Sequence, residues 1–174
     1  MPDDQTSAKL TGGAIIDALI AARIEIVPAV PDITTSAGLL WPLSRRPEIR
    51  LIRLCKEDEG VSICAALSNC GKRAALLMQQ TGLYDSLNAV ETTGVVHKQP
   101  VVMLVGLLGK EAGTPPRESK KHSVRVVEPV LRAMDVDYIV VEHDGDVPLM
   151  GPAIDRAFAL SKPLVILFGR SVAP

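Results

Sequence analysis

The sequence predicts a single three-layer α/β domain with a six-stranded, mostly parallel β-sheet. Short apolar runs rich in β-branched residues alternate with longer stretches of helical periodicity, which is the pattern of βαβ units. The predicted strands are apolar along almost their whole length, as strands are when helices cover both faces of a sheet. The 174 residues suffice for one ordinary domain and are too few for two, so we expect one domain spanning residues 1–174.

The order of the predicted elements follows these runs. Strands are expected at residues 24–27, 49–54, 74–78, 100–107, 138–141 and 163–168. Helices are expected at about 7–22, 36–43, 58–69, 85–93, 124–134 and 147–160. We expect Pro28 and Pro31 to end the first strand and Gly71 to close the third helix, since proline and glycine favour such positions. The longest irregular stretch, 109–121, is predicted to be functional or mobile, because loops of this length are uncommon in compact domains.

Composition and charge exclude several classes of partner. Hydrophobic residues make up 47% and charged residues 22%, which is the balance of a globular protein. The net charge of -1 gives no reason to expect nucleic acid or an acidic membrane surface, and 3% aromatic residues offer few stacking surfaces for bases. No apolar run approaches the ~20 residues of a membrane-spanning helix, and the acidic start is unlike a secretory signal. We therefore expect a cytoplasmic protein that binds neither membranes nor nucleic acid.

The cysteines, histidines and glycine motifs predict neither a metal centre nor a common nucleotide site. Cys55, Cys64 and Cys70 are odd in number and lack metal-type spacing, so we interpret them as reduced, mostly buried thiols. The three histidines, at positions 97, 122 and 143, are too scattered to predict a metal cluster. A dinucleotide-binding glycine fingerprint, a Walker A loop and a GxSxG nucleophile turn are all absent from the sequence.

Three acidic residues, Glu57, Asp58 and Glu59, directly follow a predicted strand and open the next helix. Ligands of open α/β sheets bind outside the carboxyl ends of the strands, which is where Glu57 is predicted to lie. The alternative is structural, because acidic side chains in the first turn of a helix interact favourably with the helix dipole. Local sequence alone favours this structural interpretation.

A second candidate site is the segment 78–89, which leaves a buried strand, turns at Thr81 and Gly82 and enters a helix. Polar side chains and exposed backbone NH groups at such a turn suit a ligand. The alternative is an ordinary capped connection between a strand and a helix.

Basic residues form a third candidate, in two groups that could bind an anionic substrate. The first group comprises Arg45, Arg46, Arg50 and Arg53, and the second comprises Lys110, Arg117, Lys120, Lys121 and Arg125. The alternative is that both groups are simply solvated, as most charged loops are.

Several short motifs occur in a fixed order: VPD at 30–32, KEDEGVSICA at 56–65, ALLMQQTGL at 75–83 and SLNA at 86–89. In order and spacing they resemble the pyrimidine-binding domain of thiamine-diphosphate-dependent decarboxylases. The similarity is greatest to the alpha subunit of sulfopyruvate decarboxylase and to the matching half of phosphonopyruvate decarboxylase. It extends over nearly the whole chain, including KHSVR at 121–125 and residues 131–138.

The resemblance implies the fold of a thiamine-diphosphate pyrimidine domain and roles for individual residues. In this family a glutamate hydrogen-bonds the pyrimidine ring of the cofactor and helps to activate the cofactor. Counted back from the GVSICA helix, the matching residue here is Glu57, and Glu59 is the second candidate for this role. Four further positions match the cofactor-binding region of the family: Gln80, Thr81, Gly82 and Asn88.

Two further features concern the substrate. His122 falls where phosphonopyruvate decarboxylase-like sequences carry an active-site histidine, and with nearby basic residues it is expected to contact the substrate. Relatives tend to have Gly-Leu-Gly in the turn after the Gln-Gln strand end, where this chain has Gly82, Leu83 and Tyr84. A tyrosine there could fill space that the substrate otherwise occupies, so the substrate can differ from that of the relatives.

The resemblance also implies a partner subunit. Family members hold Mg²⁺ and the diphosphate with a Gly-Asp-Gly sequence and a later asparagine on a second domain, whereas the single Gly-Asp of this chain, at 145–146, precedes Val147. A beta subunit is therefore expected to supply the metal and diphosphate site, in an α₂β₂ or larger heteromer. The expected reaction is decarboxylation of a small anionic 2-oxo acid such as sulfopyruvate. Two alternatives remain: a split thiamine-diphosphate lyase or carboligase with another carbonyl substrate, and a non-catalytic partner-binding module.

Overall fold

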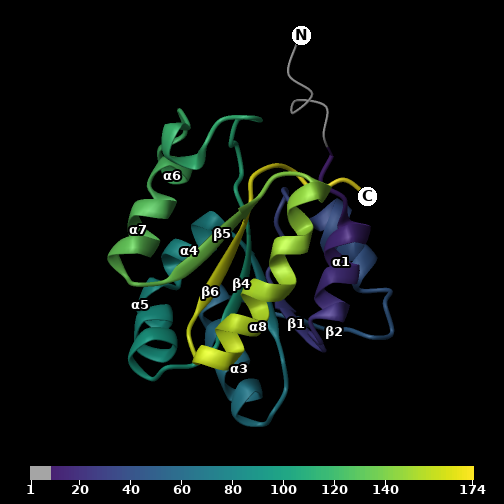
Figure 1. Cartoon of the computed structure of the whole chain (residues 1–174), viewed down its shortest axis with the longest axis vertical. Helices are drawn as coiled ribbons and strands as arrows, with labels where there is room; N and C mark the ends of the chain where they lie inside the picture. The colour runs from purple at the N-terminus through teal and green to yellow at the C-terminus, as the bar shows by residue number, and fades with distance from the viewer. Residues whose placement is uncertain (1–8) are drawn as a thin grey trace.

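A computed structural model describes residues 9–174, which form the predicted three-layer α/β domain (Figure 1). All six strands are parallel, in the order β2-β1-β3-β4-β6-β5. Along the chain the strands are β1 (Ile26–Ala29), β2 (Arg50–Arg53), β3 (Ala75–Gln79), β4 (Val102–Gly106), β5 (Asp137–Val141) and β6 (Leu164–Phe168). The predicted fold class is confirmed.

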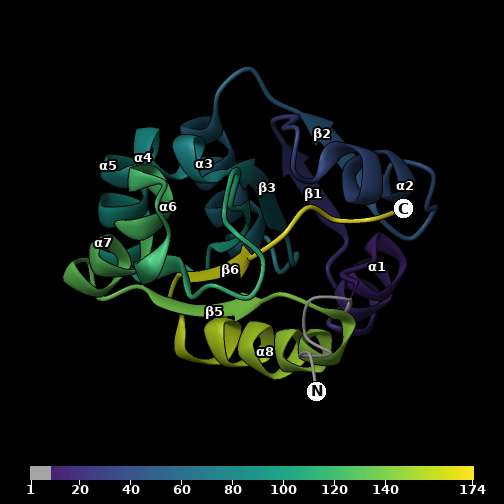
Figure 2. The same cartoon turned by 90° about the horizontal axis from the view of Figure 1, so that it is seen from above.

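Helices cover both faces of the sheet (Figure 2). One face carries α1 (Gly12–Ala21), α2 (Trp41–Leu43) and α8 (Met150–Leu160). The other face carries α3 (Glu57–Asn69), α4 (Gln80–Asp85), α5 (Leu87–Ala89), α6 (His122–Arg125) and α7 (Val127–Ala133). Short helical turns of tighter or wider pitch adjoin these helices at Ser36–Leu40, Val90–Val96, Pro116–Glu118 and Asp144–Leu149.

Side chains of the central strands alternate between two hydrophobic clusters. In β3, Leu77 belongs to the cluster that includes α1 and α8, whereas Leu76 and Met78 belong to the cluster that includes α3. All three are fully buried, and each contributes about 1.5–3 kcal/mol to stability. Burial on both faces is the reason that such a strand has a continuous apolar sequence.

The first strand differs from the prediction. β1 begins at Ile26, and Pro28 lies inside it instead of ending it, so the predicted end was wrong. β1 pairs with β2 along all four residues, but with β3 only at Ala29 and through an isolated bridge at Ile26. Proline has no NH group to donate, and the interrupted ladder with β3 accommodates it.

Helix boundaries differ most where tertiary contacts decide them. α4 begins at Gln80, directly after β3, and not near residue 85 as predicted. The first helix begins at Gly12, while positions 7 and 8 of its predicted range lie outside the described residues. Gly71, with φ +73°, follows the end of α3 and confirms the predicted stop.

The three cysteines are free thiols, but only Cys64 is buried, whereas Cys55 and Cys70 are exposed. The expectation of mostly buried thiols was therefore wrong, because Cys55 and Cys70 lie at the two ends of α3 and not along its packed face. Within residues 9–174, no helix has both the length and the apolar character needed to cross a bilayer.

Candidate functional site

The candidate site lies at the carboxyl edge of the sheet. There β2 leads into α3, β3 leads directly into α4, and β4 leads into the segment 107–121. Because parallel strands end at one edge, side chains that follow different strands meet there. Glu57, the first residue of α3, and Gly82, in the first turn of α4, are brought into contact in this way.

The three acidic residues in the first turn of α3 have different surroundings. Asp58 accepts a hydrogen bond from the backbone NH of Glu59 (3.0 Å) and pairs with Lys56 (3.6 Å). The exposed Glu59 carboxylate turns back and accepts a hydrogen bond from the NH of Cys55 (3.4 Å). Asp58 and Glu59 therefore stabilise the start of the helix, as the structural alternative expects. Glu57 makes neither kind of contact.

Glu57 is half-buried, and its carboxylate lies against α4. A Cβ atom on Gly82 would lie 2.3 Å from Glu57 Oε1 and 2.5 Å from its Cγ, so a larger residue at position 82 would displace the Glu57 side chain. Within residues 9–174, no hydrogen-bond donor or cation pairs with this carboxylate. The edge thus presents a carboxylate whose oxygen atoms are available to a ligand.

Gln80 is fully buried and pairs with the backbone of Leu108 through both ends of its amide. Its Nε2 donates to the Leu108 carbonyl (3.1 Å), and its Oε1 accepts from the Leu108 NH (2.9 Å). This pair ties the start of α4 to the segment after β4. Thr81 is exposed, and its hydroxyl donates to Gln79 Oε1 (2.9 Å). Gln80 therefore supports the site from within, while Thr81 lies on its surface.

The loop after β1, to which sequence reasoning assigned no role, also closes onto this edge. The Asp32 carboxylate accepts hydrogen bonds from the NH groups of Thr34 (2.6 Å) and Thr35 (3.2 Å) and from the Thr35 hydroxyl. A Cβ atom on Gly106 would lie 2.9 Å from Thr34 Cβ, so the loop packs closely on the end of β4. The Thr34 hydroxyl is buried without a partner among the described residues. An aspartate followed by threonines is a turn signal that could have identified this loop.

The two remaining predicted residues lie on short helices. Asn88 is exposed on α5, which packs against α3. His122 is exposed at the start of α6, with its Nδ1 3.4 Å from Arg125 Nη2. The Tyr84 hydroxyl of α4 donates a hydrogen bond to the Ser123 carbonyl of α6. The structure thus connects both Glu57 and the His122 turn to α4.

The segment 109–121 is held to the domain near both of its ends. The Lys110 side chain is completely buried and forms an ion pair with Glu142, which follows β5. Glu111 accepts a hydrogen bond from the Ser119 hydroxyl (2.7 Å), which closes the segment on itself. Lys110 therefore stabilises the fold and is not part of a solvent-facing basic surface.

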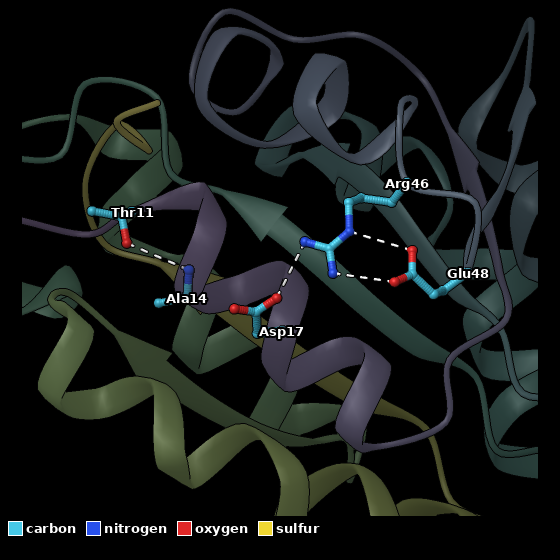
Figure 3. A network of polar contacts seen from close by, with 5 residues as sticks. All are labelled: Thr11, Ala14, Asp17, Arg46 and Glu48. Carbon is cyan, nitrogen blue, oxygen red and sulfur yellow. Dashed lines mark hydrogen bonds and ion pairs between the residues drawn. The ribbon is translucent and has the colours of Figure 1, made fainter.

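The first basic group lies around α1 and β2. Arg46 donates to Asp17 of α1 (3.2 Å) and to both carboxylate oxygens of Glu48 (3.3 and 3.4 Å), as Figure 3 shows. Hydrogen bonding to Glu48 raises the pKa of Arg46 above its ordinary value. In the same view the Thr11 hydroxyl caps α1 by accepting from the Ala14 NH (3.5 Å). Arg46 is thus engaged in connecting the chain before β2 to α1.

The sequence and the fold are similar to those of several known proteins. No model of a known protein family matches the sequence. The chain is 29% identical over 96 residues to the sulfopyruvate decarboxylase alpha subunit of Methanococcus maripaludis, covering 55% of this chain and 57% of that protein. The alpha subunit of Methanothermobacter thermautotrophicus is 24% identical over 147 residues, covering 84% and 87%. Sulfopyruvate decarboxylase of Methanosarcina acetivorans is 30% identical over 128 residues, covering 72% of this chain and 31% of that protein.

Among solved structures, a split-gene transketolase described as an inactive beta4 tetramer superposes with a TM-score of 0.56. The match covers 94% of this chain and 50% of that chain at 17% identity, so it concerns the fold. The relatives by sequence support a pyrimidine-type domain of the thiamine-diphosphate enzymes, and the structural neighbour shares the fold. The matched part makes up less than two thirds of the M. maripaludis and M. acetivorans proteins.

The polar groups at this edge have the chemistry needed to hydrogen-bond the pyrimidine end of thiamine diphosphate. Partly burying a carboxylate without a partner costs free energy, which a ligand that hydrogen-bonds to Glu57 would recover. Gly82 leaves the space that this carboxylate occupies, and the buried Thr34 hydroxyl is a second polar group without a partner in residues 9–174. The Glu57 carboxylate and the Thr34 hydroxyl are therefore suited to hydrogen-bond a polar ring that carries nitrogen atoms.

The single Gly-Asp pair of the sequence, Gly145 and Asp146, lies in a turn that Asp146 stabilises. Asp146 Oδ2 accepts hydrogen bonds from the NH groups of Glu142 (2.8 Å) and His143 (3.3 Å). Within residues 9–174, no group of three or more histidine, cysteine or acidic side chains gathers in a way that could hold a metal ion. The hydrogen bonds of the Asp146 carboxylate to the backbone stabilise the turn that follows β5.

Proposed function

We propose that the chain is the alpha subunit of a split thiamine-diphosphate-dependent 2-oxo acid decarboxylase that acts on sulfopyruvate or a similar anionic 2-oxo acid. The observation that carries the proposal is the Glu57 carboxylate, which is half-buried, seated on Gly82 and unpaired within residues 9–174. The reaction class rests on the curated relatives, which are named as sulfopyruvate decarboxylase or its alpha subunit.

Each residue of the site has a distinct task in this proposal. Glu57 holds the pyrimidine ring and shares a proton with a ring nitrogen through one of its carboxylate oxygens. Gln80 keeps α4 aligned with Leu108, so that Gly82 stays beneath Glu57. Thiamine diphosphate, when bound, supplies an electron sink for the loss of carbon dioxide.

Two further positions complete the cofactor contacts in this proposal, namely Thr81 and Asn88. Both side chains are exposed on the helices that border α3, where a bound ring or a partner chain can reach them. They are assigned to binding and not to proton transfer, because neither carries an ionisable group.

The substrate side of the site is assigned to the start of α6. His122 is exposed there and follows two exposed lysines, Lys120 and Lys121. Ammonium and imidazole NH groups donate charge-assisted hydrogen bonds to sulfonate and carboxylate oxygens. His122 is therefore the residue that we assign to substrate contact.

A beta subunit completes the enzyme in this proposal by carrying the diphosphate and Mg²⁺ site, in an α₂β₂ or larger heteromer. Three relatives are named as alpha subunits, and the structural neighbour is the product of a split gene. The engagement of Asp146 within its own turn agrees with a diphosphate site on another chain.

A second candidate function is a split thiamine-diphosphate lyase or carboligase with a different carbonyl substrate. Tyr84 favours it, because its half-buried ring can fill space that a 2-oxo acid substrate would otherwise occupy. A non-catalytic partner-binding module is the third interpretation, and the unpaired Glu57 carboxylate argues against it.

The experiment that tests the proposal is carbon dioxide release from sulfopyruvate by this chain and the protein encoded beside it, with thiamine diphosphate and Mg²⁺. We expect turnover only from the mixture. Glu57→Gln should lower the rate by about 100-fold or more, as loss of an acid–base group does. Glu59→Gln is the matched control, because the exposed Glu59 carboxylate accepts a hydrogen bond from the Cys55 NH that the amide oxygen of glutamine can also accept, and its rate should stay within about 3-fold.

Each outcome decides between the interpretations. Cofactor-dependent assembly without turnover of sulfopyruvate would move the assignment to another carbonyl substrate. Full activity in the Glu57→Gln complex would refute the role of Glu57, and a mixture that neither assembles nor binds thiamine diphosphate would refute the proposed function.

A further inference from the structure

α4 connects several parts of the site within six residues. Gln80 anchors its start to the segment after β4, and Gly82 receives the Glu57 carboxylate. Asp85 at its end forms an ion pair with Lys56 in front of α3 (3.0 Å). α4, which contacts the Glu57 carboxylate, is therefore held at its start by the segment after β4 and at its end by Lys56.

Tyr84 extends from α4 in another direction, toward α6. Its hydroxyl donates a hydrogen bond to the Ser123 carbonyl, and α4 and α6 lie side by side in both views (Figures 1 and 2). Burial raises the pKa of Tyr84 to about 12, so the phenol remains a protonated donor at neutral pH.

The helix that receives this bond has little stability of its own. α6 comprises four residues, and isolated turns of this length do not persist in water. Its first residue, His122, is exposed, and its ring Nδ1 lies 3.4 Å from Nη2 of Arg125. Buried Val124 anchors one side of the turn. The Tyr84 hydrogen bond adds a directional contact one residue from His122.

We propose that Tyr84 is a positioning residue that holds the His122 turn at a fixed position relative to Glu57, because both contact α4. The inference rests on the proposed function, in which Glu57 contacts the cofactor and His122 contacts the substrate. Because His122 contacts the substrate and not the reacting atoms of the cofactor, movement of its turn relative to Glu57 weakens substrate binding more than it slows the chemical step. A hydrogen bond between the two supporting helices limits this relative movement.

The first test is amide hydrogen exchange of the full chain carrying Tyr84→Phe, which keeps the ring and deletes the hydroxyl. The Val126 NH, bonded to the His122 carbonyl (3.1 Å), should exchange about 5- to 10-fold faster, as loss of one hydrogen bond implies. Tyr138→Phe is the matched control. Its hydroxyl accepts from Arg132 in the second turn of α7 (2.6 Å), so exchange of the Val126 NH at the end of α6 should not change.

The second test uses the enzyme assembled with its partner subunit. Tyr84→Phe should raise the KM for the 2-oxo acid about 5- to 10-fold while kcat changes less than about 2-fold, because the affected group contacts the substrate. In a His122→Ala background the same substitution should add no further loss, because coupled residues are not additive.

Unchanged exchange of the Val126 NH in Tyr84→Phe, or an undiminished KM penalty in the His122→Ala background, would overturn the inference. Failure of the proposed function gives a different result, since no 2-oxo acid would then be turned over by any variant. The exchange experiment would still decide whether Tyr84 holds the His122 turn.

Discussion

Replacing Gly82 with alanine adds one carbon atom beneath the Glu57 carboxylate. This atom would lie 2.3 Å from Oε1 and 2.5 Å from Cδ and Cγ of Glu57. Non-bonded heavy atoms settle at about 3.5 Å, so the side chain has to retreat by about 1 Å. A displacement of about 1 Å at a group that must align with a reactant costs about 100-fold. We therefore expect Gly82→Ala to lower kcat/KM of the assembled enzyme by about 100-fold.

The same substitution should leave the fold nearly as stable. Alanine is favoured over glycine inside a helix by about 1 kcal/mol. Displacing the end of the half-exposed Glu57 side chain costs about 1 kcal/mol, the low end of the range for overpacking, and this cost offsets the gain. The free energy of unfolding, measured by urea denaturation, should thus change by less than about 1 kcal/mol.

Gly151→Ala in α8 is the matched control, because nothing lies within 4 Å of the added Cβ atom there. It should raise the free energy of unfolding by about 1 kcal/mol and leave the activity unchanged. Wild-type kcat/KM in Gly82→Ala would refute the reasoning, because the carboxylate would then not need its present position. A loss of stability of more than about 2 kcal/mol in Gly82→Ala alone would also refute it.

Three further predictions concern two groups away from Glu57. Lys110→Met removes the partner of the Glu142 carboxylate and should lower the free energy of unfolding by about 2–3 kcal/mol. The loss is smaller than for a fully buried pair because 23% of the Glu142 side chain is exposed, and an unchanged urea midpoint would contradict this. Burial raises the pKa of Cys64 from 9.0 to about 12. A thiol reagent at pH 8 should therefore label the exposed Cys55 and Cys70 but reach Cys64 only after unfolding, and mass spectrometry can count the labels. As the pH rises, the Cys64 thiol loses its proton in the unfolded chain before it does so in the folded protein. Between pH 9 and 12 this difference should reduce the free energy of unfolding by up to about 1.4 kcal/mol per pH unit, and Cys64→Ala should lack this slope.

The architecture of the sheet could be predicted because its cause is local in the sequence. A strand buried on both faces needs an apolar side chain at every position, and this requirement is visible in the runs that became β3, β4 and β6. The end of α3 at Gly71 was predictable for a similar reason, since a left-handed backbone conformation there favours glycine. The placement of Glu57 at the carboxyl edge follows from its position directly after a strand.

The limits of α4 and the state of β1 depended on contacts between distant residues. Gln80 finds its partner 28 residues away, at Leu108, and this pairing lies at the start of α4. Pro28 stays inside β1 because the neighbouring ladder is interrupted beside it. Neither partner can be identified from local periodicity, which reports burial but not hydrogen-bond partners.

The sequence by itself determined the layers, the direction of the strands and the edge at which acidic and polar side chains would gather. Only the tertiary structure decided which of the three adjacent carboxylates is available, because Asp58 and Glu59 are engaged by nearby groups while Glu57 faces Gly82 on another element. It also decided that Lys110 is buried against Glu142, since a charge is taken out of water only where its counter-charge is brought to it. Burial pattern is set residue by residue along the chain, whereas the pairing of polar groups is set by which segments the fold brings together.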